Sequence, residues 1–145
     1  MNNINNFEIS VVLPTLNEEK NLQFLIQDFI KMFQNQQILE YEILIVDDGS
    51  EDGTEKLCEG FNEKNKRVKF FRRKSSPSLP LSIYDGINFA KYNNVMWLDA
   101  DGSMSAESAL KLIVRYIQSN NEIVIGSRFV EGGGYKGVQD LSNNS

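Results

Sequence analysis

The stretch that decides the fold is Asn94-Val95-Met96-Trp97-Leu98-Asp99-Ala100-Asp101-Gly102. Four apolar residues run together and then give way to two carboxylates that stand one residue apart. An unbroken apolar run of this length is typical of a buried strand in a parallel sheet, where both faces are covered. Open α/β sheets bind their ligands at the carboxyl ends of their strands, so the two acids lie where a ligand is expected.

Asp99 and Asp101 would point to the same side if the chain stays extended, because side chains repeat every second residue along a strand. Two neighbouring carboxylates repel each other, and each resists ionisation unless a positive charge lies between them. A hard divalent cation, bound by oxygen ligands and by a phosphorylated substrate, would supply that charge. The same nine residues also fit a strand followed by an acidic turn that binds nothing, so both interpretations stay open at this point.

The composition excludes several classes of protein. The 145 residues suffice for one domain with a real core, and the net charge of −5 argues against a nucleic-acid binder. The absence of histidine excludes a Ser-His-Asp triad and a histidine metal site. The single Cys58 cannot form an internal disulfide, which fits a reducing compartment. Without signal-peptide features or an apolar run of about 20 residues, we expect a cytoplasmic protein, and contact with the cytoplasmic face of a membrane is a further expectation.

Strands are expected to alternate with helices along the chain. Runs of β-branched and apolar residues predict strands at 8–13, 41–46, 67–71, in the opening stretch and at 122–125. Helical spacing predicts helices capped by Asn17, Thr54 and Ser105, and a further helix over 81–92 with Ile83, Ile87 and Ala90 on its apolar side. The sequence therefore predicts a single α/β domain over 1–145, with a mostly parallel sheet, flanking helices and a loose tail at 138–145.

Three of the predicted strands end in polar residues. These ends are Pro14-Thr15-Leu16-Asn17-Glu18, Asp47-Asp48-Gly49-Ser50 and Asp99-Ala100-Asp101. Each alone fits ordinary turn chemistry, but together they would line one edge of one sheet. The glycine-rich phosphate loops of dinucleotide dehydrogenases and P-loop NTPases do not occur, which disfavours both classes. If a nucleotide binds, Asp47 or Asp48 would hold its base or ribose, and a metal on the acid pair would hold its phosphates.

These residues also resemble a known family. Residues 11–19 (VVLPTLNEE), 45–54 (IVDDGSEDGT) and 99–101 (DAD) resemble the family 2 glycosyltransferases, which have the GT-A fold with three α/β/α layers. Residues 126–134 (GSRFVEGGG) are similar to the subgroup of dolichyl-phosphate or polyprenyl-phosphate mannose synthases. The resemblance extends from about residue 8 to residue 137, which is nearly the whole chain.

The resemblance implies a role for each matching residue. Asp47 would recognise the base, Asp48 would lie beside the base or ribose, and the other residues bordering the donor would be Pro14, Thr15, Asn17, Glu18 and Ser50. Asp99 and Asp101 would hold Mg²⁺ or Mn²⁺ against the donor diphosphate, with Asp101 as the direct ligand. Arg128 would face the phosphates, those of the acceptor above all; the alternative is a surface arginine paired with Glu131.

The implied reaction is the inverting transfer of a hexose, mannose or glucose, from a GDP- or UDP-sugar to a polyprenyl or dolichyl phosphate or to another glycan acceptor. A lipid phosphate is already anionic and needs no general base, which suits a chain without histidine. Family members carry glycines where residues 75–80 have serine and proline, and they continue beyond the glycine cluster, so we expect a chain that is short at its C-terminal end.

Two other functions stay open. The first is a nucleotide-sugar-binding module with little or no transferase activity. The second is a phosphoacceptor signalling domain, which is disfavoured because the first strand ends in proline rather than in an acid pair. The basic run Arg72-Arg73-Lys74 is expected to be a solvated surface, and Trp97 a buried aromatic of its strand.

Overall fold

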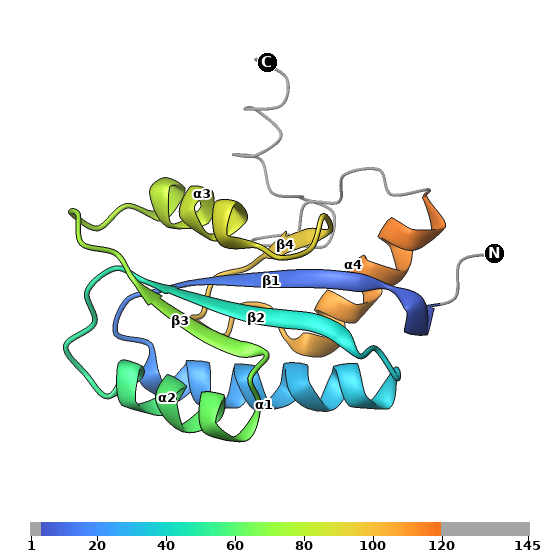
Figure 1. The fold of residues 1–145 in the computed structure, drawn as a ribbon, viewed down its shortest axis with the longest axis horizontal. Helices are drawn as coiled ribbons and strands as arrows, with labels where there is room; N and C mark the ends of the chain where they lie inside the picture. The colour runs from blue at the N-terminus through green and yellow to red at the C-terminus, as the bar shows by residue number, and fades with distance from the viewer. Residues whose placement is uncertain (1–3, 120–145) are drawn as a thin grey trace, which may run out of the picture.

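The computed structural model describes residues 4–119, in which parallel strands alternate with helices (Figure 1). The strands are β1 (Glu8–Thr15), β2 (Glu40–Asp47), β3 (Val68–Arg72) and β4 (Val95–Trp97), and the helices are α1 (Glu19–Asn35), α2 (Thr54–Lys64), α3 (Leu79–Phe89) and α4 (Ala106–Gln118), preceded by the 3-10 turn η1 (Ile4–Asn6). This arrangement confirms the predicted α/β class. The predicted strand at 122–125 and the tail at 138–145 lie outside the described residues, so the single domain over 1–145 stays a prediction.

The sheet has the strand order β3-β2-β1-β4, and every neighbouring pair is parallel. Helix α3 covers one face of the sheet, and α1, α2 and α4 cover the other (Figure 1). Because all the strands run in the same direction, their carboxyl ends meet at one edge. Among residues 4–119, no helix combines the length and the apolar character that a bilayer span requires.

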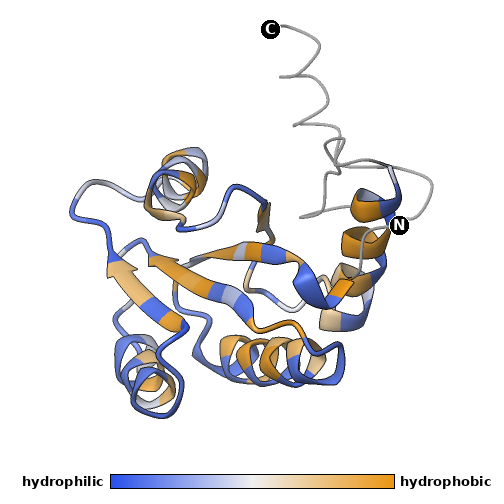
Figure 2. Cartoon of the chain, turned by 45° about the vertical axis from the view of Figure 1, so that its right-hand side comes forward, coloured by the Kyte–Doolittle hydropathy of each residue, from blue (hydrophilic) through white to orange (hydrophobic). Residues whose placement is uncertain are grey.

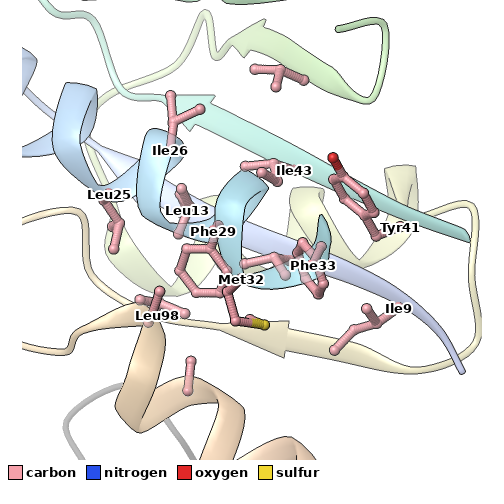
Figure 3. Close-up of a cluster of buried hydrophobic side chains, with 14 of the residues drawn as sticks. Ile9, Leu13, Leu25, Ile26, Phe29, Met32, Phe33, Tyr41, Ile43 and Leu98 are labelled. Atoms are coloured by element: carbon pink, nitrogen blue, oxygen red, sulfur yellow. The ribbon is translucent and has the colours of Figure 1, made fainter. Parts of the chain in front are cut away.

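The larger core lies between the sheet and α1. The apolar side chains of α1 recur at helical spacing and are buried; they are Leu22, Leu25, Ile26, Phe29, Met32 and Phe33. Figure 3 shows Phe29 and Phe33 facing the sheet residues Leu13 and Ile43. The ring of Phe33 stacks on that of Tyr41 with centroids 4.3 Å apart. This core fixes α1 under β1 and β2 and so fixes where both strands end.

The opposite face of the sheet is packed differently. Ser82 and Gly86 of helix α3 pack against this face, and both are buried. A Cβ on Gly86 would lie 2.3 Å from Cγ1 of Val12, so the helix approaches the sheet as closely as its backbone permits. The predicted apolar side of this helix is therefore wrong for Ile87, which is 48% exposed, whereas Ala90 packs against the smaller core on this face. Small residues, rather than large apolar ones, face the sheet here.

Pro14 does not end β1, contrary to the prediction, because β1 continues to Thr15. The even-numbered residues of β1 bond toward β4: Ser10 N–H donates to Asn94, and Val12 accepts from Leu98. Pro14 lies beyond the last of these bonds, so its missing N–H removes nothing from the ladder. Within the described residues β4 pairs only with β1, and its side chains are half-buried rather than buried.

Glu42 of β2 is a buried carboxylate that joins separate segments on the α3 side of the sheet. It accepts hydrogen bonds from Ser10 Oγ (2.6 Å), from the Lys91 N–H (2.5 Å) and from Lys69 Nζ (2.9 Å). Burial raises the pKa of Glu42, but these donors outweigh burial and hold the pKa below its ordinary value of 4.5. Glu42 is therefore charged in the folded protein at neutral pH.

Candidate active site

A cleft of about 320 Å³ opens at the carboxyl edge of the sheet. Its lining comes from the ends of β1, β2 and β4 and from the start of α3, and consists of Pro14, Thr15, Leu16, Glu18, Asp48, Pro77, Ser78, Leu79, Asp99, Ala100 and Asp101. Each of the three polar strand ends singled out in the sequence contributes to this lining. Asp48 and Asp101 thus open onto the same cleft.

The acid pair follows β4 through a turn rather than along an extended strand. The strand ends at Trp97, Ala100 and Asp101 form a turn, and Gly102 has a φ of +82°, which glycine adopts without strain. Asp99 is only 8% exposed whereas Asp101 is exposed, and Asp101 Oδ1 accepts a hydrogen bond from the Ser103 N–H at 2.9 Å. Both acids line the cleft, but a turn places them there and not an extended chain, on which the prediction depended.

The donor groups of the cleft fit a hard divalent cation that is shared with a substrate. Glu18, Asp48, Asp99 and Asp101 all supply carboxylate oxygens, which Mg²⁺ and Mn²⁺ prefer. Within residues 4–119, no group of three or more carboxylate, thiol or imidazole side chains is close enough to hold an ion alone. Mg²⁺ is commonly held by one or two carboxylates and by substrate phosphates, and the acid pair suits that arrangement.

Asp47 is turned away from the cleft and is fully buried. Its carboxylate accepts hydrogen bonds from the Gly49 N–H (2.9 Å), the Ser50 N–H (2.8 Å) and the Ser50 hydroxyl, and it pairs with Arg72 Nε at 3.3 Å. Asp47 and Ser50 therefore shape the turn that follows β2, and the structure does not bring either of them into the cleft. Base recognition by Asp47 stays a prediction.

Asp48 lies at the cleft wall and is bound there by the β3–α3 segment. Its carboxylate pairs with the guanidinium of Arg73 and accepts hydrogen bonds from the Ser78 N–H (3.1 Å) and from Ser82 Oγ (2.7 Å). The Arg73 side chain is only 4% exposed and also pairs with Asp85 of α3 at 3.0 Å. The hydrogen bond to Asp48 raises the pKa of Arg73. The expectation of a solvated basic run is therefore wrong for Arg73.

Three further residues of the cleft were not predicted from the sequence: Pro77, Ser78 and Leu79. They reach the cleft because Asp48 and Arg73 hold the segment that precedes α3. A signal for them does exist in the sequence: Ser78 is the N-cap of α3, and its Oγ accepts a hydrogen bond from the Leu81 N–H at 3.3 Å. A serine followed by a proline in the first helical turn predicts a helix start at this point, two residues before the predicted one.

Asn17 joins two loops and does not cap α1, whose N-cap is Glu18. Asn17 has a φ of +53°; its N–H donates to Ser50 Oγ and its Oδ1 accepts from the Glu51 N–H, both at 2.8 Å. Two further bonds join the same loops, from the Glu19 N–H to Asp52 (3.3 Å) and from the Gly53 N–H to Glu19 (2.9 Å). The residues after β1 and those after β2 therefore support each other behind the cleft.

Two further predictions concern single residues. Thr54 is the first residue of α2 and not its cap, which is Gly53. By contrast, Ser105 caps α4 as predicted, with its Oγ accepting from the Ser108 N–H at 3.0 Å. Arg128, with its alternative partner Glu131, lies outside the described residues.

Comparison with known proteins assigns the chain to a family. The family profile described as "Glycosyl transferase family 2" matches residues 10–143, and the chain belongs to this family. It is 36% identical over 126 residues to a dolichol-phosphate mannosyltransferase of Pyrococcus furiosus, a match that covers 87% of this chain and 34% of that protein. It is 30% identical over 136 residues to a dolichyl-phosphate beta-glucosyltransferase of Dictyostelium discoideum, covering 88% of this chain and 42% of the relative. The chain thus spans less than half the length of either relative.

Solved structures confirm the GT-A fold. TarS of S. aureus, residues 1–349, superposes with a TM-score of 0.61 at 26% identity, over 78% of this chain and 33% of the other. A mannosyltransferase of Pyrobaculum calidifontis, solved with GDP-Man and Mn²⁺, superposes with a TM-score of 0.55 at 18% identity, over 65% of this chain and 27% of the other. At 18% identity the second likeness bears on the fold alone.

Proposed function

We propose that the chain provides the donor site of an inverting glycosyltransferase, which moves mannose or glucose from a GDP- or UDP-sugar to a polyprenyl or dolichyl phosphate, or to another glycan acceptor. The observation that carries this proposal is the convergence of Asp48, Asp99 and Asp101 from two strand ends on one cleft. Membership of family 2 and the relationship to dolichyl-phosphate hexosyltransferases support it.

The cleft suggests how the donor would be divided among its residues. Glu18 and Asp48 can accept hydrogen bonds from ribose hydroxyls or base N–H groups, whereas they would repel a bare diphosphate. Asp99 and Asp101 would hold Mg²⁺ or Mn²⁺ beside the diphosphate, where the cation offsets the negative charge that grows on the leaving group. Pro14 and Thr15 would form the wall against which the nucleotide rests.

The proposed acceptor, a lipid phosphate, needs no general base. A lipid phosphate is already anionic, so it can attack the sugar from the face opposite the leaving diphosphate without losing a proton first. The chain contains no histidine that could act as a general base. Arg128 is the residue we assign to the acceptor phosphate. The proposal places the reaction in the cytoplasm, at the cytoplasmic face of a membrane, where such a lipid presents its phosphate.

A calorimetric titration of GDP-mannose, UDP-glucose and UDP-N-acetylglucosamine, with and without Mn²⁺, tests the donor site. Wild type is expected to bind one of these donors, and to bind it only in the presence of Mn²⁺. Asp101→Ala should weaken that binding by at least about 1 kcal/mol, the scale of a lost contact to a charged group. The matched control is Asp28→Ala, because Asp28 is an exposed aspartate of α1 that does not line the cleft.

Equal binding by wild type and Asp101→Ala, unaffected by metal, would contradict the proposed site. The second measurement follows sugar transfer to a short polyprenyl phosphate, and hydrolysis of the donor, with the same proteins. Metal-dependent donor binding without either reaction would favour the alternative, a nucleotide-sugar-binding module.

A further inference from the structure

Helix α3 turns its large apolar side chains away from the protein. Leu81, Tyr84 and Ile87 follow one another at a spacing of three residues and are 50%, 61% and 48% exposed. They lie opposite Ser82 and Gly86, which are buried against the sheet. We call these three residues the outer face of α3. Phe89 adds to the exposed apolar surface at the end of the helix, at 51% exposure, and its ring stacks on Phe71 at 4.4 Å.

This arrangement differs from that of the other helices of the described part. Helix α1 buries its apolar stripe and exposes mainly charged and amide side chains. In Figure 2 the ribbon of α2 is mostly hydrophilic, whereas α3 carries hydrophobic colour along much of its length. The only charged residue of α3 is Asp85, and it is bound to Arg73. The outer face therefore presents apolar groups to its surroundings with no charge among them.

Two lysines stand on either side of α3 in the chain. Lys74 precedes the helix and Lys91 follows it, and both are exposed. An apolar helix face flanked by lysines suits the headgroup region of an anionic bilayer, where the apolar groups enter the acyl boundary and the lysines meet lipid phosphates. Tyr84 is a side chain that such a boundary favours, because its ring is apolar and its hydroxyl is polar.

The position of α3 ties this surface to the cleft. Ser78 and Leu79, at the start of the helix, line the cleft together with Asp48 and the acid pair. A bilayer that meets the outer face would therefore lie beside the site where the sugar is transferred. The choice of a lipid surface over a protein partner rests on the proposed function, because the proposed acceptor is itself a lipid phosphate.

We propose that the outer face of α3, with Lys74 and Lys91, is the surface by which this protein lies on an anionic membrane. The contact is peripheral, and the apolar side chains enter only the interfacial region. It orients the cleft toward the phosphate groups of the lipid layer, so that a membrane-borne acceptor reaches the donor without leaving the bilayer.

Co-sedimentation of the full 145-residue chain with vesicles tests this proposal without any nucleotide. Wild type is expected to bind vesicles of phosphatidylcholine with phosphatidylglycerol, and to bind phosphatidylcholine alone more weakly. The double substitution Tyr84→Gln with Ile87→Gln should lower the partition coefficient between vesicles and water at least about tenfold. It removes two apolar side chains whose transfer from water into the bilayer favours binding. Lys74→Gln with Lys91→Gln should remove the preference for the anionic lipid.

The matched control is Phe24→Gln with Leu39→Gln. These residues are 62% and 66% exposed, and neither belongs to α3. The control should bind vesicles as wild type does, and circular dichroism verifies that all variants are folded. A second readout uses Tyr84→Trp and Phe24→Trp: brominated phosphatidylcholine should quench the added fluorescence of the first but not of the second.

Absence of vesicle binding by wild type, or equal binding by wild type and the Tyr84→Gln, Ile87→Gln variant, would overturn the proposal. Self-association that this variant abolishes, without vesicle binding, would instead assign the outer face to a second copy of the chain. Donor titration is measured without lipid, so loss of donor binding would contradict the proposed function while leaving the membrane contact intact.

Discussion

Arg73 holds two carboxylates from a position almost closed to water. It pairs with Asp48 at the cleft wall and with Asp85 on α3, and its guanidinium also donates to the carbonyl oxygen of Ser76 at 3.2 Å. A planar guanidinium with several donors can serve both acids at once, which a lysine ammonium cannot do with the same geometry. One side chain therefore sets the position of the segment that closes the cleft on the α3 side.

Replacement of Arg73 by alanine should lower the free energy of unfolding, and by more than Lys74→Ala does, because Asp48 loses its charged partner. Lys74→Ala should change it by less than about 0.5 kcal/mol, since Lys74 is the exposed neighbour on the same segment. Urea denaturation followed by circular dichroism measures both values. Similar values for the two variants would show that the Asp48–Arg73 pair does not stabilise the fold.

Helix α3 illustrates how a close approach decides which residues a helix buries. Leu and Ile side chains on the inner side would hold the helix away from β1, whereas Ser82 and Gly86 let its backbone approach Val12. The helix is thus held by contact between backbone and sheet, and by Ser82, whose hydroxyl donates to Asp48.

Gly86→Ala and Gly60→Ala form a matched pair that tests this packing. A Cβ at Gly86 meets Val12 at 2.3 Å, so the substitution should destabilise the protein by about 1–3 kcal/mol despite the better helix propensity of alanine. A Cβ at Gly60 of α2 meets nothing within 4 Å, so the same substitution there should stabilise by about 0.5–1 kcal/mol. Thermal or urea denaturation of the two variants gives the comparison. Equal effects would mean that α3 can move away from the sheet without loss.

The helices differ in how well the sequence predicts them. Helices α1 and α4 have apolar stripes that face the core and, for α4, a serine cap, so periodicity locates them. The inner side of α3 could not be predicted from periodicity. Periodicity assigns the side with large apolar residues to the core, whereas the buried side of α3 carries the small residues Ser82 and Gly86. Helix α2 begins one residue earlier than predicted, because Thr54 is already helical: Gly53 is the N-cap, and Asp52 Oδ1 accepts a hydrogen bond from the Thr54 N–H.

The convergence of the strand ends on one edge follows from the alternation of strands and helices, and this part of the site was predictable. The separate positions of Asp47 and Asp48 were not, because adjacent residues point to opposite sides and the sequence does not say which side is open. The two acids differ in their partners, because Asp47 pairs with Arg72 and Asp48 pairs with Arg73. Those contacts join β2 to the end of β3 and are set by tertiary packing.

The free energy of unfolding of the whole molecule is expected to fall in acid because of Glu42. This carboxylate binds groups from β1, from β3 and from the segment after α3. Because the folded-state pKa of Glu42 is lowered below 4.5, its contribution to stability is present above that pH and is lost as the pH falls through the folded-state value.

Glu42→Gln should therefore cost about 2 kcal/mol at pH 7, since a neutral amide replaces an acceptor of charge-assisted hydrogen bonds. The difference from wild type should shrink as the pH falls below 4.5. Urea denaturation over a series of pH values measures this difference, and Glu59→Gln on the exposed side of α2 serves as the control. A difference that stays constant with pH would mean that the charge of Glu42 does not contribute to stability.

The bonds from Asn17 and Glu19 to residues 50–53 make the loops after β1 and β2 one unit. A chimera that imports only one of these loops from another transferase would separate each hydrogen-bonding group from its counterpart. Engineers who wish to retune donor choice in this scaffold should transplant 14–19 and 47–54 as a single cassette, although the two stretches are far apart in the sequence.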